Sequence, residues 1–190
     1  MKINRVIILY AVVFLASSCN SSYTPKPLGY LKVEYPEKEY VMYKGDAPFQ
    51  FEYPAYAELE KGEGRDDEIH WYNMNFPMYK STLHLSYKPL QGDVDLLIRE
   101  SRDLVYKHAS QSDGIDEIPF IDKESSNYGI LYELGGNVAS AVQFFITDST
   151  EHFLRGSLYF NTTPNRDSLN PIINFIEEDI THMMETVEWK

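Results

Sequence analysis

The stretch YGILYELGGNVASAVQFFITDSTEHFLRGSLYF, residues 128–160, decides the fold class of this chain. It contains three runs that are rich in β-branched and aromatic side chains, which favour strands: Tyr128–Leu134, Val138–Thr147 and His152–Phe160. Glycine, asparagine, aspartate and serine fill the two short connections, as is typical of hairpin turns. The stretch therefore predicts three strands that are joined by two hairpins.

Shorter runs before this stretch also have the pattern of strands. We expect them at Phe49–Pro54, His70–Phe76, Ser81–Lys88 and around Ile118–Ile121. Between the first two, the charged segment Glu58–Glu68 contains two glycines, which is typical of a surface loop.

Two segments change to the spacing of three and four residues that marks an amphipathic helix. The first follows Asp93, a good N-cap residue, and its stripe is Val94, Leu97, Ile98, Ser101, Leu104, Val105 and His108. The second follows a potential cap at Ser168, and its stripe runs from Leu169 to Val187. The order of strands, helix, hairpin-linked strands and helix predicts an α+β fold, with a largely antiparallel sheet and two main helices packed on it.

The first nineteen residues have the layout of a secretory signal that ends in a lipid attachment site. Lys2 and Arg5 precede an uncharged run from Val6 to Ala16, and small residues then lead to Cys19, the only cysteine of the chain. The run is too short for a spanning helix, which needs about 20 residues. Because Ala-Ser-Ser-Cys resembles a bacterial lipobox, we expect cleavage before Cys19 and acylation of its thiol. An ordinary secretory signal with a chance cysteine is the alternative.

These features predict three regions. Residues 1–18 are a lipoprotein signal peptide, residues 19–29 are the lipidated cysteine and a flexible tether with two prolines, and residues 30–190 are a single α+β domain. The chain has 17 Lys and Arg against 29 Asp and Glu, a net charge of −12. Such a surface repels nucleic acid, so we expect no nucleic-acid partner.

The sequence predicts no cofactor, no metal site and no catalytic residues. No two histidines have the close spacing of metal ligands on one element; they are His70, His84, His108, His152 and His182. Asp148, Ser149 and His152 are the residue types of a hydrolytic triad. They lie within one expected hairpin turn, where Asp and Ser are common because they hydrogen-bond locally. A hydrolase would require these three side chains to converge in space.

Aromatic side chains are abundant, with 15 Tyr, 10 Phe and 2 Trp, and several gather in the segment from His70 to Pro77. Tyr and Trp are favoured at protein interfaces, although aromatic residues are also common in strands. Alternation places Trp71 and Asn73 on one face of the strand, with Tyr72 and Phe76 on the other; one face belongs to the core. We predict an interaction surface that includes Trp71, Tyr72, Asn73 and Phe76.

Seven segments together resemble the GldD family of gliding-motility lipoproteins, in order over nearly the whole mature chain. They are YTPKPLGY (23–30), FEYPAYA (51–57), WYNMNFP (71–77), LHLSYK (83–88), GNVASAVQFFITDS (136–149), HFLRGSLYF (152–160) and PNRDSL (164–169). The resemblance implies an accessory lipoprotein of the gliding and linked type IX secretion apparatus of Bacteroidota. Its partners would be other gliding or secretion lipoproteins and membrane components, and its one transferable residue is the lipidated Cys19.

That setting implies a location and a modification. Surface-exported lipoproteins of this phylum usually carry acidic residues after the cysteine, whereas Asn20, Ser21 and Ser22 follow Cys19. We therefore expect a lipid-anchored protein of the cell envelope, at the outer membrane and facing the periplasm. Ser149 and Ser168 lie in Asp-Ser-Thr and Asp-Ser-Leu, which resemble the O-glycosylation signal of this phylum.

The order of elements also resembles that of PsbP/Mog1-like domains, which mostly serve as binding modules. This keeps open an alternative function, a periplasmic lipoprotein that binds a small ligand in a pocket between the sheet and the helices.

Overall fold

The computed structural model describes residues 33–62 and 70–190. The predicted signal peptide, Cys19 and the tether lie outside the described residues. The described strands are β1 (Tyr40–Tyr43), β2 (Phe49–Pro54), β3 (Glu58–Lys61), β4 (Trp71–Phe76), β5 (Ser81–Pro89), β6 (Ile115–Asp122), β7 (Asn127–Leu134), β8 (Ser140–Thr147), β9 (His152–Phe160) and β10 (Glu188–Trp189). The described helices are α2 (Val94–Tyr106) and α3 (Arg166–Glu185), with short 3-10 turns at Pro77–Tyr79 and Ala109–Gln111.

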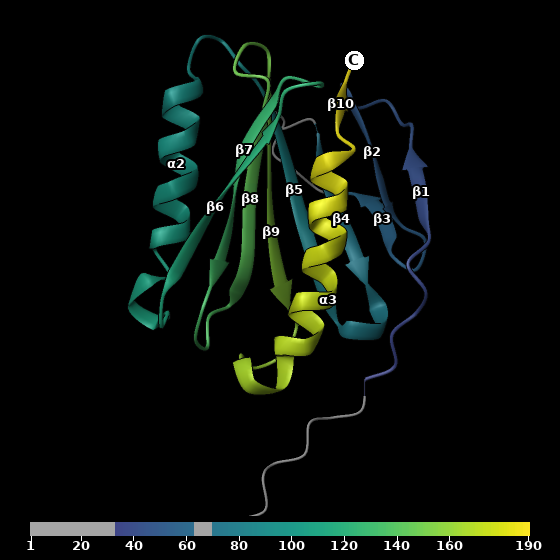
Figure 1. Ribbon diagram of the computed structural model, residues 1–190, viewed down its shortest axis with the longest axis vertical. Coiled ribbons are helices and arrows are strands. Elements are labelled where there is room, and N and C mark those ends of the chain that lie inside the picture. Colours follow the sequence, from purple (N-terminus) through teal and green to yellow (C-terminus); the bar gives the residue numbers. More distant parts are fainter. Residues whose placement is uncertain (1–32, 63–69) are drawn as a thin grey trace, which may run out of the picture. The chain divides into compact units, whose positions relative to one another are not determined.

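Seven of these strands form one antiparallel sheet in the order β3-β4-β5-β9-β8-β7-β6 (Figure 1). Its β7-β8-β9 part consists of the two predicted hairpins. A second, three-stranded sheet has the order β1-β2-β10. The antiparallel sheet and the two helices packed on it confirm the predicted α+β class.

The two faces of the large sheet differ because successive side chains of a strand point to opposite sides. Along β9, Leu154 and Leu158 are fully buried on one face, which α3 and the small sheet cover. Arg155, Ser157 and Tyr159 point to the opposite face, where α2 lies. Each face therefore has its own helix.

The helix α2 covers only part of its face. It packs against β8 and β9, and its last residue, Tyr106, donates a hydrogen bond to Glu117 of β6. In Figure 1, α2 lies on the β6-β7-β8 side of the sheet, away from β3 and β4. The β3-β4-β5 part of this face carries polar side chains that bond to one another, such as Thr82 to Asn75 (2.9 Å) and Asn75 to Glu60 (3.1 Å).

Several local expectations were wrong. Residues Glu58–Lys61 form a strand rather than a loop because they pair with β4. The cap of α3 is Asn165, whose side chain accepts a hydrogen bond from the Ser168 amide, so the helix begins before Ser168. Asp93 stands at the N-cap of α2, but its carboxylate accepts from the Gln91 amide instead of capping the helix.

Asp179 of α3 fixes the segment around β1 to the covered face. Its side chain is 1% exposed, and its Oδ1 accepts hydrogen bonds from Lys38 Nζ (3.0 Å) and the Tyr40 hydroxyl (2.9 Å). Its Oδ2 accepts a hydrogen bond from the Tyr56 hydroxyl. Burial and this carboxylate raise the pKa of both phenols, so they remain donors. Lys38 Nζ also donates to the Phe175 carbonyl at 2.8 Å.

Replacing Asp179 with Ala should lower the free energy of unfolding by about 3–5 kcal/mol, because the Lys38 ammonium then loses its buried partner. The matched control is Glu178→Ala. Glu178 pairs with the same ammonium at 3.0 Å, but its side chain is 71% exposed, so its loss should cost less than about 1 kcal/mol. Urea denaturation measures both values. Equal losses for the two variants would contradict the anchoring role of Asp179.

Candidate functional site

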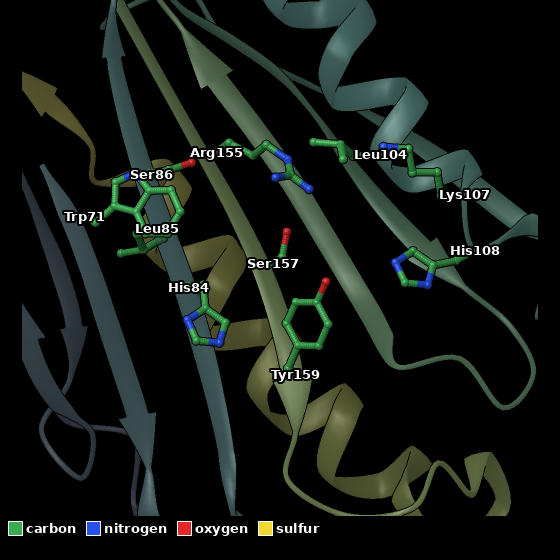
Figure 2. A pocket seen from close by; sticks show the side chains of 10 residues that line it. All are labelled: Trp71, His84, Leu85, Ser86, Leu104, Lys107, His108, Arg155, Ser157 and Tyr159. Atoms are coloured by element: carbon green, nitrogen blue, oxygen red, sulfur yellow. The ribbon is translucent and has the colours of Figure 1, made fainter. Parts of the chain in front are cut away.

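A groove lies between α2 and the uncovered part of the sheet. Its main cavity has a volume of about 610 Å³ and is lined by side chains from β4, β5, β9 and α2 (Figure 2). A second cavity of about 260 Å³ shares Trp71, Ser86, Leu104 and Arg155 with the first. Because they share these walls, the two cavities form one continuous feature, the α2 groove.

One wall of the α2 groove is a stripe of α2 itself. Leu97, Ser101 and Leu104 recur at intervals of four and three residues along one side of α2, and His108, two residues beyond the end of the helix, continues this spacing. Leu97 and Ser101 are buried, whereas Leu104 and His108 are half-buried. The amphipathic stripe predicted from the sequence therefore lines the groove at its C-terminal end.

The sheet forms the other wall and the floor. In Figure 2 the Arg155 guanidinium and the hydroxyls of Ser157 and Tyr159 face a common space. Trp71 and His84 stand on one side of this space, and the residues of α2 stand on the other. The His84 ring meets the Tyr159 ring edge-on at 5.6 Å.

Arg155 is the most unusual residue of the floor. It is half-buried in a strand whose neighbours are apolar, and this burial lowers the pKa of its guanidinium. Its Nη2 donates to Gln143 Oε1 at 2.9 Å, and the Ser157 hydroxyl lies 3.4 Å from the same oxygen. Among residues 33–62 and 70–190, no carboxylate forms an ion pair with Arg155. A poorly paired charge at such depth costs stability, as functional residues often do.

The α2 groove is locally positive although the chain carries a net charge of −12. Among the described residues, Lys88, Lys107 and Arg155 line it together with one carboxylate, that of Glu100. Burial lowers the pKa of His84, which keeps that ring neutral near pH 7. The groove therefore attracts anions.

Two donors near Arg155 lack acceptors. Within the described part of the chain, Trp71 Nε1 and Gln143 Nε2 are buried without a hydrogen-bond partner. Buried polar groups are usually paired, so two unpaired donors beside a cation mark a site that is rich in donors and poor in acceptors.

The predicted interaction surface is divided between the two faces of β4. Trp71 and Asn73 point to the face of the α2 groove, and Asn73 Oδ1 lies 2.7 Å from His84 Nδ1. Tyr72 and Phe76 are 6% and 1% exposed and belong to the core. Including these two in an exposed surface was therefore wrong: alternation separated the faces but did not tell which one is buried.

Asp148, Ser149 and His152 build the β8–β9 turn. Asp148 Oδ1 accepts hydrogen bonds from the backbone amides of Thr150, Glu151 and His152 at 3.0, 2.9 and 2.9 Å. Ser149 has the left-handed φ of 67° that such a turn requires. His152 Nδ1 lies 2.8 Å from the Tyr87 hydroxyl, and its ring stacks on another ring, that of Trp189. These contacts hold the β8–β9 turn and pack the His152 ring beside it.

The other residues that the sequence analysis singled out, two histidines and two serines, lie apart from the groove. His182 Nε2 lies 2.7 Å from Glu52 Oε2, and the His70 ring packs against Tyr87. In the part of the chain that the structure describes, no three metal-binding side chains come together. Ser149 and Ser168 are both exposed, and their O-glycosylation stays a prediction.

Comparison with known proteins identifies a family and structures with a similar fold. The family model described as gliding motility lipoprotein GldD matches residues 20–189, which confirms the resemblance seen in the sequence. No curated protein matches the chain significantly. The solution structure of cyanobacterial PsbP (CyanoP) from Synechocystis sp. PCC 6803 is 12% identical and has a TM-score of 0.47, covering 87% of this chain and 100% of that one. Among the described residues, no helix has the length and apolarity to cross a membrane.

Replacing Arg155 with Met should leave the free energy of unfolding unchanged or raise it by up to about 2 kcal/mol, because it removes a half-buried charge that no carboxylate of the described residues pairs with. Chemical denaturation gives the value. Leu154→Ala, on the other face of the same strand, should cost about 2–5 kcal/mol and shows that the assay reports on β9. A loss above about 1 kcal/mol for Arg155→Met would assign this arginine to the stability of the fold.

Proposed function

This chain belongs to the GldD family of gliding motility lipoproteins, and we propose that it is a non-catalytic accessory component of the gliding and type IX secretion apparatus. It works through protein–protein contacts while a lipid holds it at the membrane. The family supports the association with gliding and with the cell envelope. The observation that carries the contact role is the α2 groove, a positive, aromatic-walled feature on the open face of the sheet.

The membrane tether follows from the N-terminal sequence. Acylated Cys19 becomes the first mature residue, and the proline-containing segment after it spaces the domain from the lipid. Absence of acidic residues in Asn20-Ser21-Ser22 favours the periplasmic side of the outer membrane. The partners are then other lipoproteins or membrane components of the same envelope.

The composition of the α2 groove supports a docking role. Trp, Tyr and Arg are the residue types that most often dominate binding energy at protein interfaces. Here Trp71, Tyr159 and Arg155 stand together around one space, and Tyr159 is 36% exposed. Polar side chains such as Asn73 and Thr82 lie near them on β4 and β5, so the surface combines apolar and polar contacts as protein interfaces do.

The size of the main cavity favours a second candidate function, the binding of a small ligand. A volume of about 610 Å³ falls within the range of small-molecule sites, roughly 300–1,000 Å³. Native mass spectrometry of protein released gently from membranes distinguishes the two. A small molecule that copurifies in stoichiometric amount favours the ligand site.

Chemical crosslinking in intact cells, followed by purification from native membranes, tests the contact role. We expect enrichment of gliding or secretion components over a matched lipoprotein bait that carries the same signal peptide and tether but an unrelated domain. Equal recovery of those components with both baits would refute the assembly role.

Replacing Cys19 with Ala should release the protein from membranes or leave it as an unprocessed precursor, because the lipid can no longer be attached. Fractionation and intact-mass measurement check both outcomes. The control Ser21→Ala keeps the thiol and should stay lipidated in the membrane fraction. A Cys19→Ala protein of mature mass that remains membrane-bound would disprove lipid anchoring at this residue.

A further inference from the structure

We propose that the α2 groove binds a short extended segment of a partner protein, in which one Asp or Glu side chain is flanked by aromatic or apolar residues. The carboxylate pairs with Arg155, and the flanking side chains lie on Trp71 and Leu104. This inference rests on the proposed function, since the segment would belong to a component of the same apparatus. It adds the chemistry by which that component is recognised.

The charge of the groove selects an acidic segment. The chain as a whole has 29 acidic and 17 basic residues, so it repels acidic partners at most of its surface. The α2 groove reverses this sign through Lys88, Lys107 and Arg155. An acidic segment is therefore attracted to this one place, and complementary charge of this kind raises both specificity and the rate of encounter.

Because Arg155 lies on the floor of the groove, a single acidic side chain can reach it, whereas a flat anionic surface cannot. Arg155 is half-buried on the floor, whereas His84, Tyr159 and Lys107 are exposed at the rim. A lipid headgroup layer would meet the rim first and leave the guanidinium below it. A carboxylate at the end of an Asp or Glu side chain can reach down and form two parallel hydrogen bonds with the guanidinium.

The donors around Arg155 suit such a side chain and its backbone. The guanidinium bonds to Gln143 through Nη2, and no carboxylate of the described residues pairs with it. The hydroxyls of Ser157 and Tyr159 face the same space. A carboxylate would add a charged acceptor to the neutral Gln143 oxygen that Arg155 and Ser157 share, and hydrogen bonds to charged groups are the stronger ones.

The length and walls of the groove suit an extended peptide. This wall runs from Leu97 in α2 to His108 just after the helix ends, which spans about 16 Å at a rise of 1.5 Å per residue. An extended segment of about five residues has the same length. Trp71 and Leu104, which line both cavities together with Arg155, give apolar surface where the flanking side chains can pack.

The test uses the full mature chain in lipid nanodiscs and isothermal titration calorimetry. The probes are the capped pentapeptide Ser-Phe-Glu-Phe-Ser and its neutral counterpart with Gln in place of Glu. We expect the Glu peptide to bind about tenfold more tightly than the Gln peptide. Arg155→Gln should remove this preference by weakening the Glu peptide about tenfold and the Gln peptide less than about twofold.

The matched control is Arg99→Gln. Arg99 is exposed on α2, outside the groove, and its loss changes the net charge by the same amount. It should change the affinity for the Glu peptide less than about twofold. Lys107→Gln, at the exposed rim, should weaken that peptide by a smaller factor than Arg155→Gln. Thermal unfolding of each variant shows that the fold is intact.

Three results would overturn the proposal: equal affinity for the two peptides, equal losses for Arg155→Gln and Arg99→Gln, or no peptide binding. Tighter binding of 3-phenylpropionate than of the Glu peptide would also overturn it, since the groove would then be a small-ligand site. These failures differ from failure of the proposed function. Peptide binding can fail while crosslinking still enriches gliding components, and crosslinking can fail while the peptide still binds at Arg155.

Discussion

One helix is too narrow to cover one face of a seven-stranded sheet, and the arrangement of this domain depends on that constraint. Strands lie about 4.8 Å apart, so seven of them span about 29 Å, whereas a helix with its side chains is about 10 Å wide. The 13-residue α2 therefore covers the β8-β9 region and leaves β4 and β5 open. The step between helix and open sheet is the α2 groove.

The opposite face of the large sheet is covered by two elements instead of one. There α3 shares the face with the three-stranded sheet β1-β2-β10, and Asp179 bonds to Lys38, Tyr40 and Tyr56 across the junction. The stability of the domain thus comes mainly from the closed face, where most large buried side chains lie. The open face carries Arg155, which has no carboxylate partner within residues 33–62 and 70–190, and two buried donors that find no acceptor among the same residues.

The sequence predicts those parts of the fold that depend on local pattern. The hairpins of β7, β8 and β9 and the two helices each have strong periodicity and turn residues, and they form as expected. The strands β1, β3 and β10 are short, and β3 is mostly charged; each is defined by its pairing with β2 or β4, which its own residue pattern does not show. The candidate site, too, follows only in part from local sequence. Arg155 stands out within HFLRGSLYF as one charge in an apolar strand, but its meeting with Trp71 and Leu104 requires the sheet order and the position of α2.

Site-specific photo-crosslinking in living cells shows whether the partner contacts the face of the α2 groove. Tyr159 and Tyr35 are a matched pair: both are exposed tyrosines, 36% and 43%, but Tyr159 borders the groove, whereas Tyr35 packs against Phe175 of α3 on the other face. A photoreactive phenylalanine at position 159 should crosslink a gliding or secretion component on illumination, and the same residue at position 35 should not. Crosslinking of that component from position 35 and not from position 159 would contradict the account.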